Sequence, residues 1–241
     1  GENVTPEKLV VISQHVQREL TVRLARRLLD LQTLPYLVVI NPHIQRVFGL
    51  YGEAFKTLVN YPKVVNITQD QKFVELMKRL VAEGLQVVPW LAKGVQEASQ
   101  KVPCSQLNLN RFMSDMIMSR ISRRVIAEQY IALHEQREGY IGVICPQMSA
   151  AEAIRRVTPE AQATCQRTYG CTPPEVLVEG DESITCSYLP THLDYILFEN
   201  LKNALRAVVE RHTSKKELGK KLPPVKVLLA KGPSDISIRL S

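Results

Sequence analysis

Four polar residues near the end of the chain have the types and the spacing to do chemistry. Glu199, Lys202, Asn203 and Arg206 stand at positions i, i+3, i+4 and i+7. On a helix of 3.6 residues per turn these four side chains share one face, and Tyr195 extends the same stripe by one turn. The spacing therefore predicts one acid, one amide and two cations on a single helix face.

These groups supply the parts that phosphoryl transfer needs. The carboxylate of Glu199 could accept a proton from a nucleophilic hydroxyl. The amide oxygen of Asn203 could ligate Mg²⁺, which prefers hard oxygen donors, and Lys202 and Arg206 could offset phosphate charge. The spacing alone also fits an exposed helix face with ordinary i, i+3 and i, i+4 pairs.

A second pair of cations lies in the middle of the chain. Arg120 and Arg124 are four residues apart in Ser119-Arg120-Ile121-Ser122-Arg123-Arg124. On a helix both would face the same way and could bind a carboxylate through paired hydrogen bonds. Salt bridges between helices are the alternative interpretation of this pair.

The elements that must position the middle pair are helices. Residues 1–137 show apolar positions at helical spacing, interrupted at Leu34-Pro35 and Tyr61-Pro62, where proline ends a helix. Asn41-Pro42 is a helix start signal. We expect four long amphipathic helices forming a bundle, over Val10–Leu31, Asn41–Tyr61, Thr68–Gln100 with a kink at Pro89, and Leu107–Glu135.

Residues 138–241 mix strands and helices, which predicts a second domain of the α/β type. We expect a strand at Tyr140–Ile144 and helices at Ala150–Tyr169, strained by Pro159, and at His192–His212. Two hairpins are predicted from alternating patterns, one pairing Glu175–Glu179 with Ile184–Tyr188, the other pairing Val225–Leu229 with Asp235–Leu240. The fold class is thus α plus α/β.

Composition excludes several classes of protein. Hydrophobic residues make up 45% and charged residues 23%, as in globular proteins. The net charge of +7 comes from scattered Lys and Arg that are not interleaved with aromatic residues, so we expect no nucleic-acid partner. No stretch has the ~20 apolar residues of a membrane span.

Six motifs in order resemble the mitochondrial 2-oxoacid dehydrogenase kinases of the GHKL ATPase superfamily. Glu199-x-x-Lys202-Asn203-Ala204-x-Arg206 resembles the N-box of that family. The other five are Leu34-Pro35-Tyr36 with Asn41-Pro42, Tyr51-x-x-Ala54-Phe55, Ser119-Arg120-Ile121-Ser122-x-Arg124, Ala132-Leu133-His134-Glu135 and Tyr140-Ile141-Gly142-Val143-Ile144.

The resemblance implies a fold and roles. A four-helix-bundle regulatory domain at 1–137 is followed at 138–241 by the first part of a GHKL ATP-binding sandwich. Glu199 is similar to the catalytic base that acts on a substrate serine, Asn203 to the Mg²⁺ ligand, and Lys202 and Arg206 to cations that contact or support the nucleotide. Arg120 and Arg124 match arginines of an allosteric 2-oxoacid pocket. The cofactors implied are ATP and Mg²⁺, with K⁺ as a further cation.

His134 and Tyr195 bear on which relative is closest in function. A bundle beside a GHKL domain also resembles histidine sensor kinases, but in this family a packed or hydrogen-bonded His134 is expected instead of a phosphoacceptor. Tyrosine at 195 and the Ala132–Glu135 motif resemble the branched-chain kinases, whereas Leu197-Phe198 resembles the pyruvate dehydrogenase kinases. The branched-chain enzyme is the first expectation, and pyruvate dehydrogenase kinase is the alternative.

The resemblance also implies partners and a compartment. These are the E1 subunit as substrate, the lipoyl domain of E2, a homodimer of the full-length protein, and the mitochondrial matrix. A non-catalytic module that binds the lipoyl domain is a further alternative. The family continues a strand like Ile236–Leu240 with Asp-x-Gly-x-Gly, which binds adenine. Because residues 1–241 do not include that motif, we expect this stretch alone to be inactive and not to bind ATP tightly.

Overall fold

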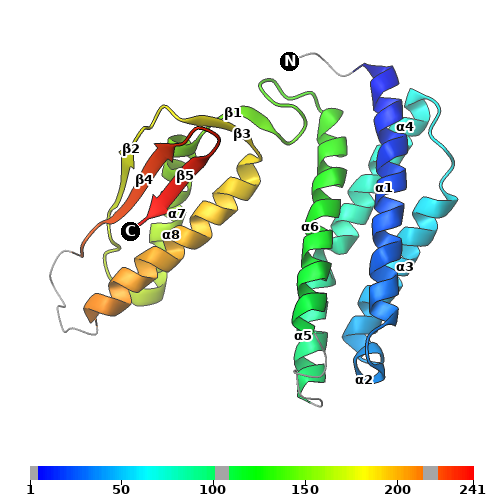
Figure 1. Ribbon diagram of the computed structural model, residues 1–241, viewed down its shortest axis with the longest axis horizontal. Helices are drawn as coiled ribbons and strands as arrows, with labels where there is room; N and C mark the ends of the chain where they lie inside the picture. The colour runs from blue at the N-terminus through cyan, green and yellow to red at the C-terminus, as the bar shows by residue number, and fades with distance from the viewer. Residues whose placement is uncertain (1–4, 101–108, 214–221) are drawn as a thin grey trace. The chain divides into compact units, whose positions relative to one another are not determined.

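The computed structural model describes residues 5–100, 109–213 and 222–241. The chain divides into two compact units, Gly1–Arg137 and Glu138–Ser241 (Figure 1). Each unit has its own apolar core. The described part of the first unit is helical, and the second combines helices with small sheets. The α plus α/β class predicted from the sequence is therefore confirmed at this level.

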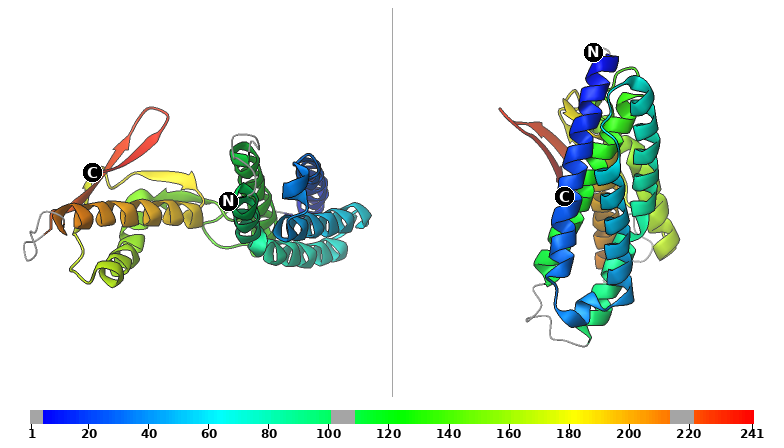
Figure 2. Two further views of the ribbon diagram at one scale, coloured as in Figure 1. Left: turned by 90° about the horizontal axis from the view of Figure 1, so that it is seen from below. Right: turned by 90° about the vertical axis from the view of Figure 1, so that its right-hand side faces the viewer.

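The first unit contains α1 (Pro6–Gln32), α2 (Tyr36–Val39), α3 (Pro42–Asn60), α4 (Ile67–Glu83), η1 (Gly84–Gln86), α5 (Val87–Ser99) and α6 (Leu109–Leu133). The long helices run side by side (Figure 2). α1 packs against α3, α4 and α6, while α5 packs chiefly against α3. Leu31, Val47, Phe73, Met77 and Tyr130 are among the fully buried side chains of its core.

Capping residues set the starts of α3 and α4, and the sequence predicted the first of these two caps. The side-chain oxygen of Asn41 accepts hydrogen bonds from the backbone N–H groups of His43 and Ile44, at 2.9 and 3.4 Å, with Pro42 in the first turn. Asn66 caps α4 in the same way by accepting from Gln69 N–H at 2.9 Å. Such caps satisfy N–H groups that have no partner within the helix.

The helix expected at Thr68–Gln100 is interrupted earlier than Pro89. α4 ends at Glu83, a short 3₁₀ turn covers Gly84–Gln86, and α5 starts at Val87. Pro89 then falls in the first turn of α5, where a missing N–H costs nothing. The expected interruption of this helix is therefore present, but it lies at Gly84–Gln86 instead of at Pro89. The fourth helix was expected from Leu107, which lies outside the described residues.

The second unit contains β1 (Cys145–Ser149), α7 (Ala150–Tyr169), β2 (Val176–Gly180), β3 (Thr185–Tyr188), α8 (Pro190–Thr213), β4 (Val225–Lys231) and β5 (Ile236–Leu240). β2, β4 and β5 form one sheet, and β1 pairs with β3 in a second, two-stranded sheet. α7 packs along α8, and both helices contact the three-stranded sheet. Pro159 lies inside α7, which nevertheless continues to Tyr169.

Strand pairing differs from the sequence prediction in two places. β2 and β3 do not form a hairpin, because β2 pairs in parallel with β4 and β3 pairs antiparallel with β1. The expected strand Tyr140–Ile144 is a tight turn closed by a bridge between Ile141 and Ile144, with Gly142 at φ 61°. An alternating pattern reports a half-buried strand but not its partner. The hairpin of β4 and β5 was predicted and is confirmed.

Candidate functional site

The polar residues predicted to share a face do so on α8. This helix runs unbroken from Pro190 to Thr213. Leu197, Leu201 and Leu205 are buried against the sheet and α7, with exposed fractions of 2% or less. Because these leucines are at i, i+4 and i+8, they fix which side of the helix faces the core. The opposite side, which carries Glu199 and Asn203, faces outward.

Glu199 and Lys202 form a close ion pair on that face. The Lys202 ammonium nitrogen lies 2.7 and 2.6 Å from the two carboxylate oxygens of Glu199. Their side chains are 35% and 34% exposed. Lys202 also lies 5.4 Å from the centre of the Phe198 ring, a distance at which a cation is attracted to a ring face. The carboxylate is therefore held in place beside a cation and remains reachable from solvent.

Asn203 and Tyr195 complete the outward stripe. Both side chains are exposed, one turn after and one turn before Glu199. An exposed amide oxygen one turn from a carboxylate is a donor set that suits a hard cation such as Mg²⁺. The face thus offers a base, a cation and an oxygen donor within two helical turns.

Arg206 is committed to a different set of contacts. Its Nε donates to Glu210 Oε1 at 2.8 Å, and the Tyr169 hydroxyl of α7 donates to the same oxygen at 2.9 Å. The hydrogen bond from Arg206 is the main cause that lowers the pKa of Glu210, and the hydrogen bond from Tyr169 lowers it further. Arg206 therefore acts in this structure as part of a link between α8 and α7.

An ion pair with two hydrogen bonds ties the start of α8 to α7. Arg156 donates from Nε and Nη2 to the two oxygens of Asp194, at 3.0 and 2.6 Å. The hydrogen bonding to Asp194 raises the pKa of Arg156. Paired bonds of this kind fix orientation as well as distance. Asp194 precedes Tyr195 directly, so this contact orients the turn of α8 that leads into the polar face.

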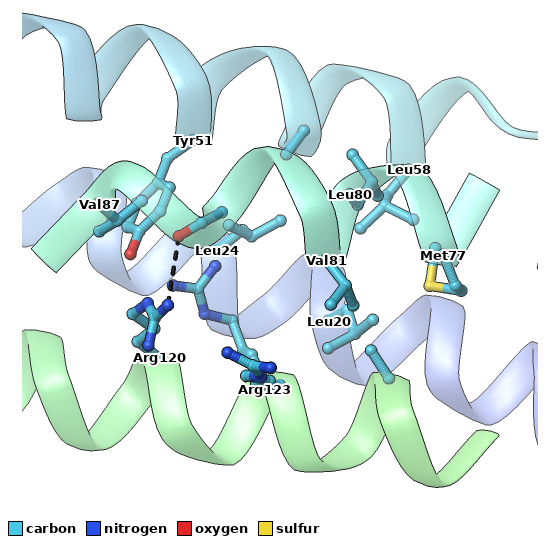
Figure 3. A pocket seen from close by; sticks show the side chains of 14 residues that line it. Leu20, Leu24, Tyr51, Leu58, Met77, Leu80, Val81, Val87, Arg120 and Arg123 are labelled. Atoms are coloured by element: carbon cyan, nitrogen blue, oxygen red, sulfur yellow. Dashed lines mark hydrogen bonds between the residues drawn. The ribbon is translucent and has the colours of Figure 1, made fainter. Parts of the chain in front are cut away.

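The first unit contains a small cavity of about 90 Å³ between its helices (Figure 3). Apolar side chains make up most of its wall, and Arg120, Arg123 and Arg124 of α6 contribute the positive charge. Both arginines predicted to bind a carboxylate therefore border the cavity. Arg124, however, is 43% exposed and donates to Glu128 one turn along, at 2.7 Å.

Arg123 was missed by the sequence analysis. Its guanidinium lies over the Tyr51 ring, 4.3 Å from the ring centre. Burial is the main cause that lowers the pKa of Arg123, and the charges of Arg120 and Arg27 lower it further, against an opposing effect of Tyr51. Arg120 shares a helix face both with Arg123, at i+3, and with Arg124, at i+4. The spacing alone therefore does not show which of these two residues points inward together with Arg120.

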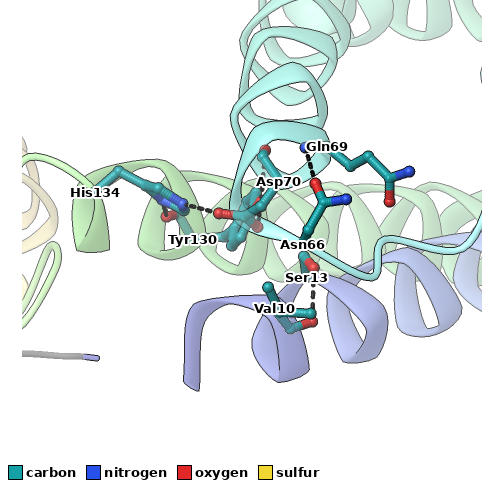
Figure 4. Close-up of polar contacts among 7 residues, drawn as sticks. All are labelled: Val10, Ser13, Asn66, Gln69, Asp70, Tyr130 and His134. Carbon is teal, nitrogen blue, oxygen red and sulfur yellow. Dashed lines mark hydrogen bonds and ion pairs between the residues drawn. The ribbon is translucent and has the colours of Figure 1, made fainter. Parts of the chain in front are cut away.

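His134 belongs to a buried polar network at the end of α6 (Figure 4). Its Nε2 lies 2.6 Å from Asp70 Oδ2, and its Nδ1 lies 2.9 Å from the carbonyl oxygen of Tyr130. The Tyr130 hydroxyl donates to Asp70 Oδ1 at 2.5 Å. Asp70 and Tyr130 are fully buried. Both imidazole nitrogens of His134 are therefore occupied by structural contacts.

Asp70 could have been found in the sequence. It shares a helical stripe with Phe73, Val74 and Met77, all of which are buried core residues. A carboxylate on an apolar stripe requires hydrogen-bonding partners. Those partners come from α6, more than fifty residues away in the chain, and local spacing gives no access to them.

Comparison with known proteins assigns the family. The family model described as mitochondrial branched-chain alpha-ketoacid dehydrogenase kinase matches residues 1–145. A mitochondrial pyruvate dehydrogenase (acetyl-transferring) kinase of Arabidopsis thaliana is 32% identical over the whole of this chain. Isozyme 3 of the same kinase from Mus musculus is 30% identical over 94% of this chain, and kinase 2 of Saccharomyces cerevisiae is 29% identical over 88%. The chain belongs to the family of mitochondrial 2-oxoacid dehydrogenase kinases.

The chain spans only part of the length of these relatives. It covers 66% of the Arabidopsis protein, 57% of the mouse protein and 45% of the yeast protein. No helix in the described ranges is long and apolar enough to cross a membrane.

Proposed function

We propose that this chain is part of an ATP-dependent protein-serine kinase that phosphorylates and inactivates the E1 component of a mitochondrial 2-oxoacid dehydrogenase complex. The observation that carries the proposal is the outward face of α8, where Glu199 is held beside Lys202 at 2.6–2.7 Å. Family membership gives this face its meaning, because the same spacing on an unrelated helix would be an ordinary ion pair.

Glu199 would act as the base in this reaction. Its partly exposed carboxylate can accept the proton of a serine hydroxyl as that oxygen attacks. Lys202 holds the carboxylate in place in the free protein. When a phosphoryl group approaches, the same ammonium can turn toward the developing negative charge, which leaves the carboxylate free for the hydroxyl.

The donors on α8 fit the cofactors that the family implies. Asn203 presents an exposed amide oxygen one turn from Glu199 and would hold Mg²⁺. Bound ATP would supply the phosphoryl group, and Mg²⁺ would offset its charge. Lys202 would contact the nucleotide, and Arg206 would support the helix through Glu210. A role for K⁺ stays a prediction.

Pyruvate dehydrogenase E1 is the substrate that we favour. The Arabidopsis, yeast and mouse relatives are all named as kinases of pyruvate dehydrogenase. Tyr195 and the Ala132–Glu135 motif had favoured the branched-chain complex, and the family model matching residues 1–145 carries the branched-chain name. That match ends within β1, before the face that carries Glu199, so we give the relatives that extend over α8 more weight.

The remaining parts of the proposal concern architecture and partners. We infer that unit 1 is the four-helix-bundle regulatory domain and that unit 2 is part of a GHKL ATP-binding sandwich. The lipoyl domain of E2, a homodimer of the full-length protein and the mitochondrial matrix follow from the same family assignment. The cavity bordered by Arg120 and Arg124 would be the regulatory pocket for a 2-oxoacid.

A sensor kinase that phosphorylates its own His134 is less well supported. A sensor kinase of this kind would attach the phosphoryl group to a ring nitrogen of His134. The Nε2 of His134, however, lies against the buried carboxylate of Asp70. Phosphorylation there would have to break that contact and bring a second negative charge against the first. A non-catalytic module that binds the lipoyl domain would leave the polar face of α8 without a use.

The test is a transfer assay with the full-length protein. Purified pyruvate and branched-chain E1 would be offered side by side with radiolabelled ATP. We expect acid-stable phosphoserine on pyruvate E1 and slower labelling of branched-chain E1. Faster labelling of branched-chain E1 would reverse the substrate assignment. Acid-labile phosphate on the kinase itself, without transfer to either E1, would contradict the proposal.

A further inference from the structure

Two exposed apolar side chains lie beside the proposed base on α8. Tyr195 and Ile196, which we call the apolar step, are 67% and 45% exposed. They lie four and three residues before Glu199, so all three side chains share one helix face. At 1.5 Å per residue, the step lies about 4.5–6 Å before Glu199 along the helix axis. Single exposed apolar residues are ordinary on a surface, but these two adjoin a group with a proposed chemical role.

The apolar step is held in place by anchored residues on both sides. Asp194 directly precedes Tyr195, and its two carboxylate oxygens accept hydrogen bonds from Arg156 of α7 at 3.0 and 2.6 Å. Leu197 directly follows Ile196 and is buried in the core of unit 2 at 2% exposed. Binding on the step therefore requires little ordering of the backbone, which lowers the entropic cost of association.

The two ends of the polar face differ in chemistry. Asn203, the proposed Mg²⁺ ligand, lies one turn after Glu199, whereas the apolar step lies one turn before it. In phosphoryl transfer the attacking and leaving oxygens are roughly in line, on opposite sides of the phosphorus. If the nucleotide lies toward Asn203, the peptide that carries the attacking serine lies toward Tyr195.

The spacing of an extended peptide fits this arrangement. Successive side chains of a strand point to opposite faces, at ~3.2–3.4 Å per residue. A side chain two positions from the serine therefore points the same way as the serine, ~6.4–6.8 Å along the peptide. That length is close to the distance of about 4.5–6 Å between Glu199 and the step along α8. When the serine hydroxyl reaches Glu199, the side chain two positions away reaches Tyr195 and Ile196.

We propose that Tyr195 and Ile196 select substrates by a bulky apolar side chain two residues from the phosphorylated serine. The selected class is an extended peptide segment with an aliphatic or aromatic residue at that position. The inference rests on the proposed function, and it adds the sequence around the serine that the site accepts. Burial of that side chain against the step supplies the preference, because it removes apolar surface from water.

Equilibrium binding of peptides to the full-length protein tests this selection without phosphate transfer. The probes are fluorescein-labelled, alanine-based peptides with one serine, which carry either leucine or asparagine two positions before or two positions after it. Asparagine is close to leucine in size but is polar. In anisotropy titrations we expect one leucine peptide to bind about tenfold more tightly than its asparagine counterpart. Equal affinities at both positions, or no binding of any peptide, would overturn the proposal.

Three variants locate the selection. Tyr195→Ser and Ile196→Ser should each reduce the leucine preference to about threefold or less. Leu228→Ser is the control, because it removes a side chain that is 40% exposed on β4, and it should keep the tenfold preference. An unchanged preference in both α8 variants would remove the step from the substrate site. If a variant does not fold by circular dichroism, the preference in the unaltered protein still decides.

Two further readouts separate this proposal from other outcomes. If sedimentation velocity shows that Tyr195→Ser converts a dimer to a monomer and the unaltered protein has no leucine preference, the step is a contact between copies and the proposal fails. Labelling of E1 from ATP is measured independently of peptide binding. The kinase assignment can therefore hold without the leucine preference, and a leucine preference without transfer to E1 would count against the kinase assignment alone.

Discussion

Lys202 and Glu199 are joined by two short contacts on α8, with the ammonium nitrogen 2.7 and 2.6 Å from the carboxylate oxygens. Glu199 lies one turn before Asn203, and the pair is on the side of the helix that faces away from Leu197, Leu201 and the core. Lys202 holds the proposed base in place, and its ammonium group would also lie close to a phosphoryl group bound on this face.

Replacing Lys202 by methionine should slow transfer to E1. The change removes a charge-assisted contact to Glu199 and a cation near the transferred group, while keeping most of the side-chain volume. Since the pair is about one-third exposed, we expect a modest loss of about tenfold in kcat/KM. Steady-state kinetics with ATP and E1 would measure it.

Lys226→Met is the matched control for this variant. The Nζ of Lys226 on β4 lies 2.8 Å from a carboxylate oxygen of Glu179 on β2. This ion pair is on the sheet and does not belong to the polar face of α8. We expect kcat/KM to stay within about twofold of the unaltered protein, as for most surface ion pairs. Equal kinetics for Lys202→Met and Lys226→Met would remove Lys202 from the site.

Asp70 should be important for the stability of unit 1. Asp70→Ala removes the acceptor for both the Tyr130 hydroxyl and the His134 ring, and leaves those groups without their partner. We expect a loss of about 2–5 kcal/mol in the free energy of unfolding. Urea denaturation followed by circular dichroism measures it. Asp115→Ala, an exposed acid 3.9 Å from Arg111, should cause no measurable change, and similar midpoints for the two variants would contradict the account.

Tyr130 should make stability fall at high pH. Burial, followed by the hydrogen bond to Asp70 and the charge of Asp70, raises the pKa of Tyr130. A raised folded pKa means that the contribution is complete below the unfolded value of about 10 and is lost as the pH rises above it. We expect the stability difference between the unaltered protein and Tyr130→Phe to shrink above pH ~10, by up to about 1.4 kcal/mol per pH unit. A difference that stays constant to higher pH would show that Tyr130 is not the cause.

The pairing of β2 with β4 depends on one glycine. Gly180 has φ +94°, and a Cβ atom placed there would lie 2.1 Å from the Leu229 carbonyl oxygen. Gly180→Ala should therefore cost about 2 kcal/mol or more in the free energy of unfolding. Gly52→Ala is the contrasting variant, because Gly52 lies inside α3 with open space around it. It should stabilise the protein by about 0.5–1 kcal/mol. Thermal unfolding of both variants tests the contrast.

The sequence predicted the parts of this protein that depend on local spacing. The caps at Asn41-Pro42, the helix around Glu199 and the hairpin of β4 and β5 each follow from residues close in the chain. Glu199 and Asn203 were placed on one face for the same reason, since four residues make about one helical turn.

Contacts between distant segments could not be predicted in this way. The parallel pairing of β2 with β4 joins strands separated by β3 and α8, and an alternating pattern gives no partner. The network of Asp70, Tyr130 and His134 joins α4 to α6. The inward turn of Arg123 depends on Tyr51 of α3, which offers its ring face. In each case a contact between segments that are distant in the chain determines the partner or the direction of a residue, and local spacing does not predict that contact.

Glu199 is the proposed base of a protein-serine kinase. The most direct measurement is the rate of phosphate transfer from ATP to E1 by the full-length protein with Glu199→Gln, which keeps the shape of the side chain and removes its basicity. We expect kcat to fall by about 10²–10⁴, with the KM for ATP changed less than about threefold. Transfer to E1 at a rate within tenfold of the unaltered protein would contradict the assignment.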